Sequence, residues 1–332
     1  MIEEKTVTTG KRISVEETAA WLKERDNYLI ITHRRPDGDT VGCAGALAQG
    51  LRELGKTAYV LSNPEITPRY SRFIQGYLAT ASYKAENIIS VDTASTDLFP
   101  KNGKEYCNAV SLSIDHHPSN SLFAESTCLD ETTASCGEII FEILIALSGS
   151  ISPRSAECLY TALTTDTGCF VFANTTANTL RIASLLIKAG APHKHLNRLL
   201  FRTKTRSRVK IESMIYAGLE FHYDGEVAIS TITREMMESA NADEDDLDDI
   251  SSMPGSIKGV HAGITIRELT SNECKISVRT SPLVNAHAIS ERFDGGGHPM
   301  AAGFTLEKSV PEVKKAVVEV LTDFFPAKML EE

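Results

Sequence analysis

Histidine and aspartate residues gather in four short segments of the first half of the chain. The segments are residues 33–39, Asp92, the triplet at 115–117, and Asp166. Imidazole and carboxylate ligands without thiolate suit manganese, iron, cobalt or zinc better than calcium. Crowded carboxylates repel one another unless cations neutralise them. The four segments therefore predict a metal site, and two divalent ions about 3.5–4 Å apart would serve phosphoester hydrolysis.

Each signal taken alone also has an ordinary structural interpretation. An aspartate after a strand is more often a helix cap or a turn former, and Asp37-Gly38 is by itself a turn signal. The pair His116-His117 is equally compatible with one core and one surface histidine. The chemical interpretation depends on all four segments occurring together, in order, next to predicted strands or at a helix end.

Short apolar runs precede three of the segments and predict the strands that position them. These runs are residues 28–32, 87–91 and 110–114, and a further strand is predicted at 57–61. Helical spacing predicts helices at residues 14–25, 40–54, 133–147, 153–164, 176–188 and 192–200. Alternating strands and helices predict an α/β fold with a mostly parallel sheet and helices on both faces. Ligands of such sheets bind at the carboxyl ends of the strands, and Asp166 would join from a helix end.

The length of 332 residues favours two domains. A basic, polar stretch containing Arg202, Lys204, Arg206 and Arg208 marks the change between them. We predict a catalytic domain over residues 1–200, a linker helix over 201–219 and a smaller α/β domain over 220–332. The smaller domain would contain strands at 227–232, 260–266 and 275–280 and a closing helix at 310–325.

Composition limits the partners and the compartment. A formal net charge of −10 argues against binding of long duplex nucleic acid, while a small anionic ligand remains compatible. The seven cysteines include no C-x-x-C pair, which favours a reducing cytoplasm over a disulfide framework. Residues 1–11 are polar, so we expect no signal peptide, and the apolar stretch at 139–147 is too short to span a membrane. A homodimer is left open.

The order of these motifs resembles that of the DHH phosphoesterase superfamily. Asp115-His116-His117 follows a strand, His33, Asp37, Asp39 and Asp92 precede it, and Asp166 follows it. In the second half, Arg279-Thr280-Ser281 and the glycine-rich stretch at 295–303 resemble the DHH-associated domain of the first type. The resemblance covers roughly residues 14–325. It is closest to the bacterial branch of oligoribonucleases and 3′-phosphoadenosine-5′-phosphate (pAp) phosphatases.

The resemblance implies a role for each residue. One metal ion, manganese before others, would be held by His33, Asp37 and Asp92. The second would be held by Asp39, Asp92, His116 and Asp166, with Asp92 bridging the two. The catalytic group would comprise His116, His117 beside the scissile phosphate, and Asp115 orienting a histidine. Substrate contacts would come from His117 and, in the second domain, from Arg279, Gly295, Gly296, Gly297 and His298.

The activity implied is metal-dependent hydrolysis of short oligoribonucleotides (nanoRNA) by an exoribonuclease that also removes the 3′-phosphate of pAp. A cyclic or linear di-AMP phosphodiesterase is the enzymatic alternative, and a catalytically silent nucleotide sensor is the alternative of another class. A manganese pyrophosphatase is disfavoured by the glycine-rich stretch, and a RecJ-type exonuclease by the short chain. Departures from the family pattern at Arg34, Arg35, Cys43 and Val171 leave the preferred substrate open.

Overall fold

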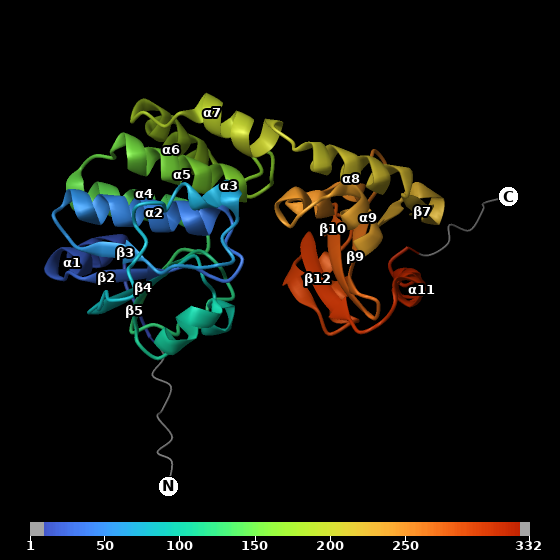
Figure 1. The fold of residues 1–332 in the computed structure, drawn as a ribbon, viewed down its shortest axis with the longest axis horizontal. Helices are drawn as coiled ribbons and strands as arrows, with labels where there is room; N and C mark the ends of the chain where they lie inside the picture. Colours follow the sequence, from blue (N-terminus) through green and yellow to red (C-terminus); the bar gives the residue numbers. More distant parts are fainter. Residues whose placement is uncertain (1–9, 326–332) are drawn as a thin grey trace, which may run out of the picture. The chain divides into compact units, whose positions relative to one another are not determined.

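The computed structural model describes residues 10–325, so most of the polar N-terminal stretch used to argue against a signal peptide lies outside it. The chain divides after Thr203 into two compact units, each with its own sheet (Figure 1). No helix within the described residues is long and apolar enough to cross a membrane. All seven cysteines fall in the described part of the chain, and none of them is in a disulfide.

The first unit is built on a six-stranded sheet in the order β1-β6-β5-β4-β2-β3. All of its strand pairs are parallel. The strands are β1 (Lys11–Arg12), β2 (Tyr28–Ile31), β3 (Ala58–Val60), β4 (Asn87–Val91), β5 (Val110–Asp115) and β6 (Ser126–Leu129). The predicted parallel sheet is confirmed, and the four predicted strands of this domain are present within one or two residues of their predicted limits.

Layers of helices cover one face of this sheet (Figure 1). They are α1 (Val15–Glu24), α2 (Gly38–Glu53), α4 (Cys136–Ser148), α5 (Pro153–Asp166) and α6 (Ala177–Lys188). Alternate residues of β2 separate the two faces: Tyr28 and Ile30 pack under the helices, and Leu29 and Ile31 pack in a second apolar cluster. Short 3-10 helices, η1 (Thr96–Leu98) and η2 (Lys101–Tyr106), lie beside that second cluster, which includes Phe99.

The helix boundaries follow from their caps. Ser14 and Glu17 form the predicted capping box of α1. Helix α2 begins at Gly38, two residues before the predicted start, because the Asp37 side chain accepts hydrogen bonds from the backbone N–H groups of Asp39 and Thr40. Helix α5 extends to Asp166, so this residue occupies a helix end as predicted.

Small residues let α2 and α5 approach closely. A Cβ atom at Gly42 would lie 2.5 Å from the carbonyl oxygen of Cys158, and one at Gly38 would lie 2.4 Å from the Thr165 side chain. Glycine at both positions therefore allows the end of α5 to lie against the beginning of α2. This contact brings Asp166 to the segment that carries Asp37 and Asp39.

The remaining helices of the first unit are α3 (Pro68–Ser71) and α7 (His193–Asn197), which continues into the π-helical segment η3 (Arg198–Arg202). The second unit begins near α8 (Arg206–Ala217). Its sheet has the order β11-β12-β10-β9-β8-β7, with only β8 and β9 parallel. The strands are β7 (Glu220–His222), β8 (Val227–Ile232), β9 (Ala262–Thr270), β10 (Glu273–Thr280), β11 (Gly296–His298) and β12 (Ala301–Leu306).

Helices and short turns complete the second unit. They are η4 (Tyr223–Gly225), α9 (Arg234–Ala240), η5 (Asp245–Leu247), η6 (Ile250–Ser252), η7 (Pro254–Ser256), α10 (Ala286–Glu291) and α11 (Val310–Leu321). Val313, Val317 and Leu321 of α11 are buried with the inner residues of β9 and β10, which forms a separate hydrophobic core. The predicted smaller α/β fold is confirmed, and its closing helix ends at Leu321 rather than at the predicted residue 325.

Candidate metal centre

Three adjacent strands deliver the predicted metal-binding segments to one edge of the sheet. Strands β5, β4 and β2 are neighbours, and all three run parallel. Their carboxyl ends are followed by His116, Asp92 and His33, respectively. The strand order therefore places side by side three side chains that are up to 83 positions apart in the sequence.

The side chains at this edge form three overlapping groups that could hold metal ions. They are His33 with Asp37 and Asp92; Asp92 with His116 and His117; and Asp39 with His116 and Asp166. In each group, one candidate ligand atom per residue lies within 4.8 Å of the others. All six predicted metal ligands belong to these groups, and so does His117.

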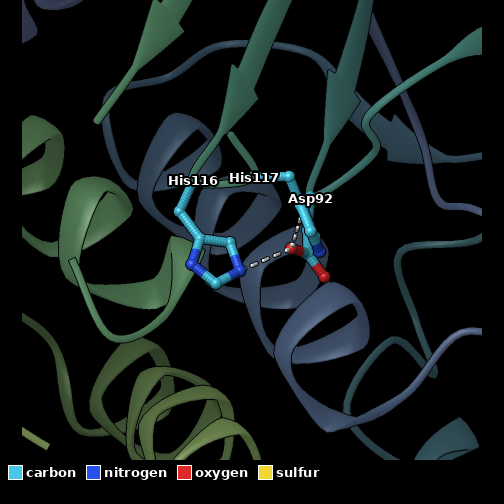
Figure 2. Close-up of side chains that lie close together, drawn as sticks. All are labelled: Asp92, His116 and His117. Carbon is cyan, nitrogen blue, oxygen red and sulfur yellow. Dashed lines mark ion pairs between the residues drawn. The ribbon is translucent and has the colours of Figure 1, made fainter. Parts of the chain in front are cut away.

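The two carboxylate oxygens of Asp92 face different groups. Oδ2 lies 3.9 Å from Nε2 of His33. Oδ1 lies 3.6 Å from Nε2 of His116 and 3.6 Å from Nδ1 of His117. Figure 2 shows both histidine rings beside the Asp92 carboxylate. Asp92 also has a φ of 51°, a left-handed conformation that is uncommon for a residue other than glycine. A carboxylate that bridges two metal ions must direct its two oxygens toward two ligand groups, as the Asp92 carboxylate does.

The electrostatics of the site favour a bound cation. Burial and the neighbouring carboxylates raise the pKa values of Asp39, Asp92 and Asp166 above the ordinary aspartate value. Among residues 10–325, their ion-pair partners are histidines rather than lysine or arginine. Oδ1 of Asp92 is buried and accepts no hydrogen bond from any described residue. A buried carboxylate oxygen that accepts no hydrogen bond and lies beside imidazole nitrogens fits a divalent metal ion.

His33 has one ring nitrogen available for a metal ion. Its Nδ1 lies 2.7 Å from the carbonyl oxygen of Arg34, which can only accept a hydrogen bond. Nδ1 must therefore carry a proton, and in the neutral ring Nε2 then keeps its lone pair. Nε2 is the atom that faces Asp92. The backbone after β2 thus selects the tautomer that a ligand needs.

Asp39 is held by the beginning of a helix distant in sequence. Its carboxylate accepts hydrogen bonds from the backbone N–H groups of Cys136, at 2.7 Å, and Gly137, at 3.0 Å. These groups belong to the first turn of α4, where unpaired N–H groups and the helix dipole stabilise negative charge. The buried Cys43 thiol donates to Oδ1 of Asp39 at 3.3 Å. Cys43, one of the departures from the family pattern, therefore contacts a predicted metal ligand.

Asp115 is fully buried and positions the histidine two residues after it. Its Oδ1 accepts from Nδ1 of His117 at 2.8 Å, and its Oδ2 accepts from Asn120 at 2.6 Å. Burial alone would raise the pKa of Asp115, but these hydrogen bonds hold it below the ordinary value. Burial alone would lower the pKa of His117, but the hydrogen bond to Asp115 and the nearby charge of Asp92 raise it to about 9.

Asp166 and His116 join the end of α5 to the end of β5. Nε2 of His116 lies 3.4 Å from Oδ2 of Asp166 and 3.9 Å from Oδ2 of Asp39. The other ring nitrogen of His116 lies 3.4 Å from the carbonyl oxygen of Thr133. As with His33, a backbone acceptor on one side of the ring leaves the other nitrogen facing carboxylates.

The remaining predicted contacts, Arg279 and His298, belong to the second unit. Arg279 on β10 and His298 on β11 are both register partners of Ala301 on β12. Residues directly opposite in antiparallel strands have their side chains on the same face, so Arg279 and His298 share a face of this sheet. Arg279 is partly buried and His298 is exposed.

The three glycines before His298 differ in what surrounds them. A Cβ atom at Gly295 or Gly297 would lie 2.6 Å from a backbone carbonyl oxygen, so glycine at these two positions permits the close approach of β12. Gly297 also has a φ of 140°. Gly296 is exposed, with no atom of the described residues within 4 Å of a Cβ placed there. Its backbone is therefore open to a ligand.

Three of the four departures from the family pattern, Arg34, Arg35 and Val171, lie on the surface. Arg34 is exposed, and Arg35 is exposed with its Nε 3.7 Å from Glu65. Val171 is 80% exposed, five residues after Asp166. The ring of Phe172 next to it packs against Gly168 and is 47% exposed. Val171 and Phe172 therefore form an apolar surface close in sequence to a candidate metal ligand.

Sequence reasoning missed two residues that contact the predicted site residues. Thr40 contacts His33, Asp37 and Asp92 through one hydroxyl group. Asn120 donates to Asp115. A threonine in the first turn of a helix is an ordinary sequence feature, so the pattern gave no signal for Thr40. Asn120 lies three residues beyond His117, between β5 and β6, and a polar residue there gives no signal of a role in the site.

Comparison with known proteins shows which family models and relatives the chain resembles. Residues 27–163 match the N-terminal domain of the DHH family, and residues 224–326 match the DHHA1 domain. A bifunctional oligoribonuclease and PAP phosphatase of Thermus thermophilus is 30% identical over 307 residues, covering 88% of this chain and 90% of the relative. The corresponding protein of Bacillus subtilis is 25% identical over 288 residues, covering 85% and 90%.

A solved structure shows the same fold over nearly the whole length. An exopolyphosphatase-related protein from Bacteroides fragilis is 24% identical, with a TM-score of 0.82 and coverage of 94% of this chain and 96% of the other. The two domain matches and the full-length relatives agree with the motif order at the sheet edge. The chain therefore belongs to the DHH family of phosphoesterases.

Proposed function

We propose that this chain is a two-metal phosphoesterase that hydrolyses short oligoribonucleotides and removes the 3′-phosphate of pAp. The observation that carries the proposal is the buried Asp92, whose two carboxylate oxygens face two different groups of ligands. Relatives named for these two activities span most of the chain, which supports this choice of substrates.

The proposed ligands follow the geometry of the site. His33, Asp37 and Asp92 would hold one divalent ion, and Asp39, Asp92, His116 and Asp166 would hold the other. The nitrogen and oxygen donors fit manganese. When bound, two such ions polarise a phosphoryl oxygen and neutralise the charge that develops during hydrolysis.

The protein's own groups prepare the site for an anionic substrate. The hydrogen bond from Nδ1 of His117 to Asp115 helps to raise the pKa of His117 to about 9, so the protonated ring can donate from Nε2 to a phosphoryl oxygen. The beginning of α4 holds the Asp39 carboxylate in place, and its N–H groups oppose the burial that raises the pKa of this group. In the second unit, Arg279, His298 and the open backbone at Gly296 would bind a second phosphate or a base of the substrate.

The substrate class also agrees with the charge of the chain. A formal net charge of −10 suits a substrate with few phosphates, since binding of long nucleic acid depends on many lysine and arginine contacts. The seven unpaired cysteines support the reducing cytoplasm as the place of action.

The test is a turnover panel with manganese. Short RNA, short DNA, pAp, linear and cyclic di-AMP, and pyrophosphate are compared at equal concentration, with the Asp92→Asn variant as the inactive control. The proposal expects the highest kcat/KM for short RNA and pAp. Preference for a di-AMP substrate would replace the proposed specificity, and binding without turnover of any substrate would indicate a nucleotide sensor.

A further inference from the structure

The hydroxyl group of Thr40 lies at the meeting point of three candidate ligands. Its Oγ1 is 2.6 Å from Oδ2 of Asp92, 2.6 Å from Nε2 of His33 and 3.1 Å from Oδ1 of Asp37. Thr40 is fully buried in the first turn of α2. These three partners are the members of the first proposed metal group. One side chain thus contacts every residue of that group.

The single proton of this hydroxyl has one good acceptor when the site is loaded. Nε2 of His33 must keep its lone pair for the metal ion, and Asp37 Oδ1 already accepts from the backbone N–H groups of Asp39 and Thr40. Oδ2 of Asp92 is the closer carboxylate oxygen. The Thr40 hydroxyl therefore donates to Asp92, and the charge on the acceptor makes this a strong hydrogen bond.

This hydrogen bond fixes the rotation of the Asp92 carboxylate. Among residues 10–325, Thr40 is the group that donates a hydrogen bond to this side chain, and Oδ1 accepts none. Without the hydroxyl, the carboxylate is free to turn about its Cβ–Cγ bond, whose torsional preference is broad. Rotation would exchange the directions in which Oδ1 and Oδ2 point. The separate contacts with His33 and His116 require these directions to be fixed.

We propose that Thr40 is a positioning residue of the metal centre, whose hydroxyl holds the Asp92 carboxylate in its bridging orientation. The inference rests on the proposed two-metal function. It assigns to Thr40 a role beyond helix capping, because the cap of α2 is made by the Asp37 side chain and the backbone of Thr40, not by its hydroxyl.

The experiment separates the hydroxyl from the shape of the side chain. Thr40→Val keeps the shape and removes the hydroxyl, and Thr40→Ser keeps the hydroxyl and removes the methyl group. Thr18→Val is the matched control: Thr18 is also fully buried in the first part of a helix, and its hydroxyl donates to the carbonyl oxygen of Ser14. Binding of Mn²⁺ to each metal-free protein is measured by calorimetry and electron paramagnetic resonance, without substrate.

Thr40→Val should lower the affinity for Mn²⁺ about 10- to 100-fold, the range found when a partner of a metal ligand is removed. Thr40→Ser should restore binding close to that of the unmodified protein, and Thr18→Val should not weaken it. Thermal unfolding without metal identifies a variant that fails to fold. With pAp as substrate, the loss in Thr40→Val should fall on kcat at limiting Mn²⁺ and diminish as Mn²⁺ is raised.

Two results would overturn the inference while leaving the two-metal function intact. One is unchanged Mn²⁺ affinity in a folded Thr40→Val protein, and the other is an equal loss in Thr40→Ser, which would assign the effect to packing of the methyl group. A different result, no Mn²⁺ binding by the unmodified protein, would remove the two-metal proposal itself and the role of Thr40 with it.

Discussion

Oδ1 of Asp115, the last residue of the buried strand β5, lies 2.8 Å from Nδ1 of His117, two residues further along the chain. The carboxylate also accepts from Asn120, so its orientation is fixed from two sides. Asp115 is absent from the groups that could hold a metal ion, whereas His117 is present in one of them. The contact therefore connects a fully buried carboxylate to the site through the histidine ring.

The first prediction is that Asp115→Asn lowers turnover while leaving most metal binding in place. The Asn side chain keeps the shape but loses the charge that orients and stabilises the His117 ring. We expect kcat on pAp to fall about 10- to 100-fold, the usual effect of removing such a partner. Steady-state kinetics and Mn²⁺ content are measured together. The exposed Asp130 supplies the control variant Asp130→Asn. A large loss of metal with normal turnover per bound metal would contradict the proposed role.

The second prediction concerns the bridging residue. Asp92→Ala should remove at least one of the two divalent ions and nearly all turnover, because both proposed groups share this carboxylate. Elemental analysis of the purified variant after equilibration with Mn²⁺ gives the stoichiometry. Asp130→Ala, outside the centre, should bind as the unmodified protein does. Full activity in Asp92→Ala would rule out the two-metal proposal.

The sequence was sufficient to predict the strands that end at the site. Residues 28–31, 87–91 and 110–115 are short apolar runs, and burial on both faces of a parallel sheet requires such runs. Strand β6 (Ser126–Leu129) was missed because Ser126-Thr127-Cys128-Leu129 is too short and too polar to stand out. Strands β11 and β12 were missed because glycine and alanine dominate them, which local propensity assigns to a loop.

Contacts distant in sequence explain what could not be predicted within the site. Asp39 and the N–H group of Cys136 are 97 positions apart, and no local spacing indicates that the first turn of α4 would hold this carboxylate. The Thr40 hydroxyl reaches Asp92 across 52 positions. Family resemblance indicates which residues form the site, but hydrogen-bond partners such as these depend on how α2, α4 and β4 pack together.

The third prediction tests the close packing that brings Asp166 to the centre. Gly42→Ala should destabilise the protein by about 1–3 kcal/mol, because the new Cβ would meet a backbone carbonyl of α5 that cannot move without the helix. Gly50→Ala in the same helix is the control, since its Cβ would meet the end of the flexible Leu144 side chain. Denaturant unfolding without metal measures both. Equal stability of the two variants would show that α5 adjusts freely.

The fourth prediction is that the second unit contributes to substrate binding and the first unit holds the metal ions. Arg279→Ala or His298→Ala should weaken substrate binding by about 1–3 kcal/mol, as expected when a charge-assisted hydrogen bond to a phosphate is lost. Mn²⁺ binding should be unchanged, since neither residue is in the candidate metal groups. Arg292→Ala is the control, because Arg292 lies on the same domain in an exposed ion pair with Asp323. A fall in metal content would contradict this division.

The last prediction is that turnover per RNA end falls steeply between a dinucleotide or trinucleotide and an RNA of about twenty units. The proposed contacts involve the terminal phosphates and one or two bases, which a short substrate already provides. The additional phosphates of a long strand would meet a protein of formal net charge −10, and without lysine and arginine contacts they add no favourable free energy of binding. Ordering each additional unit costs conformational entropy as well. Second-order rate constants for both lengths are compared at matched concentration of ends and fixed salt. Equal or faster cleavage of the long RNA would refute the length preference and point to a general exonuclease.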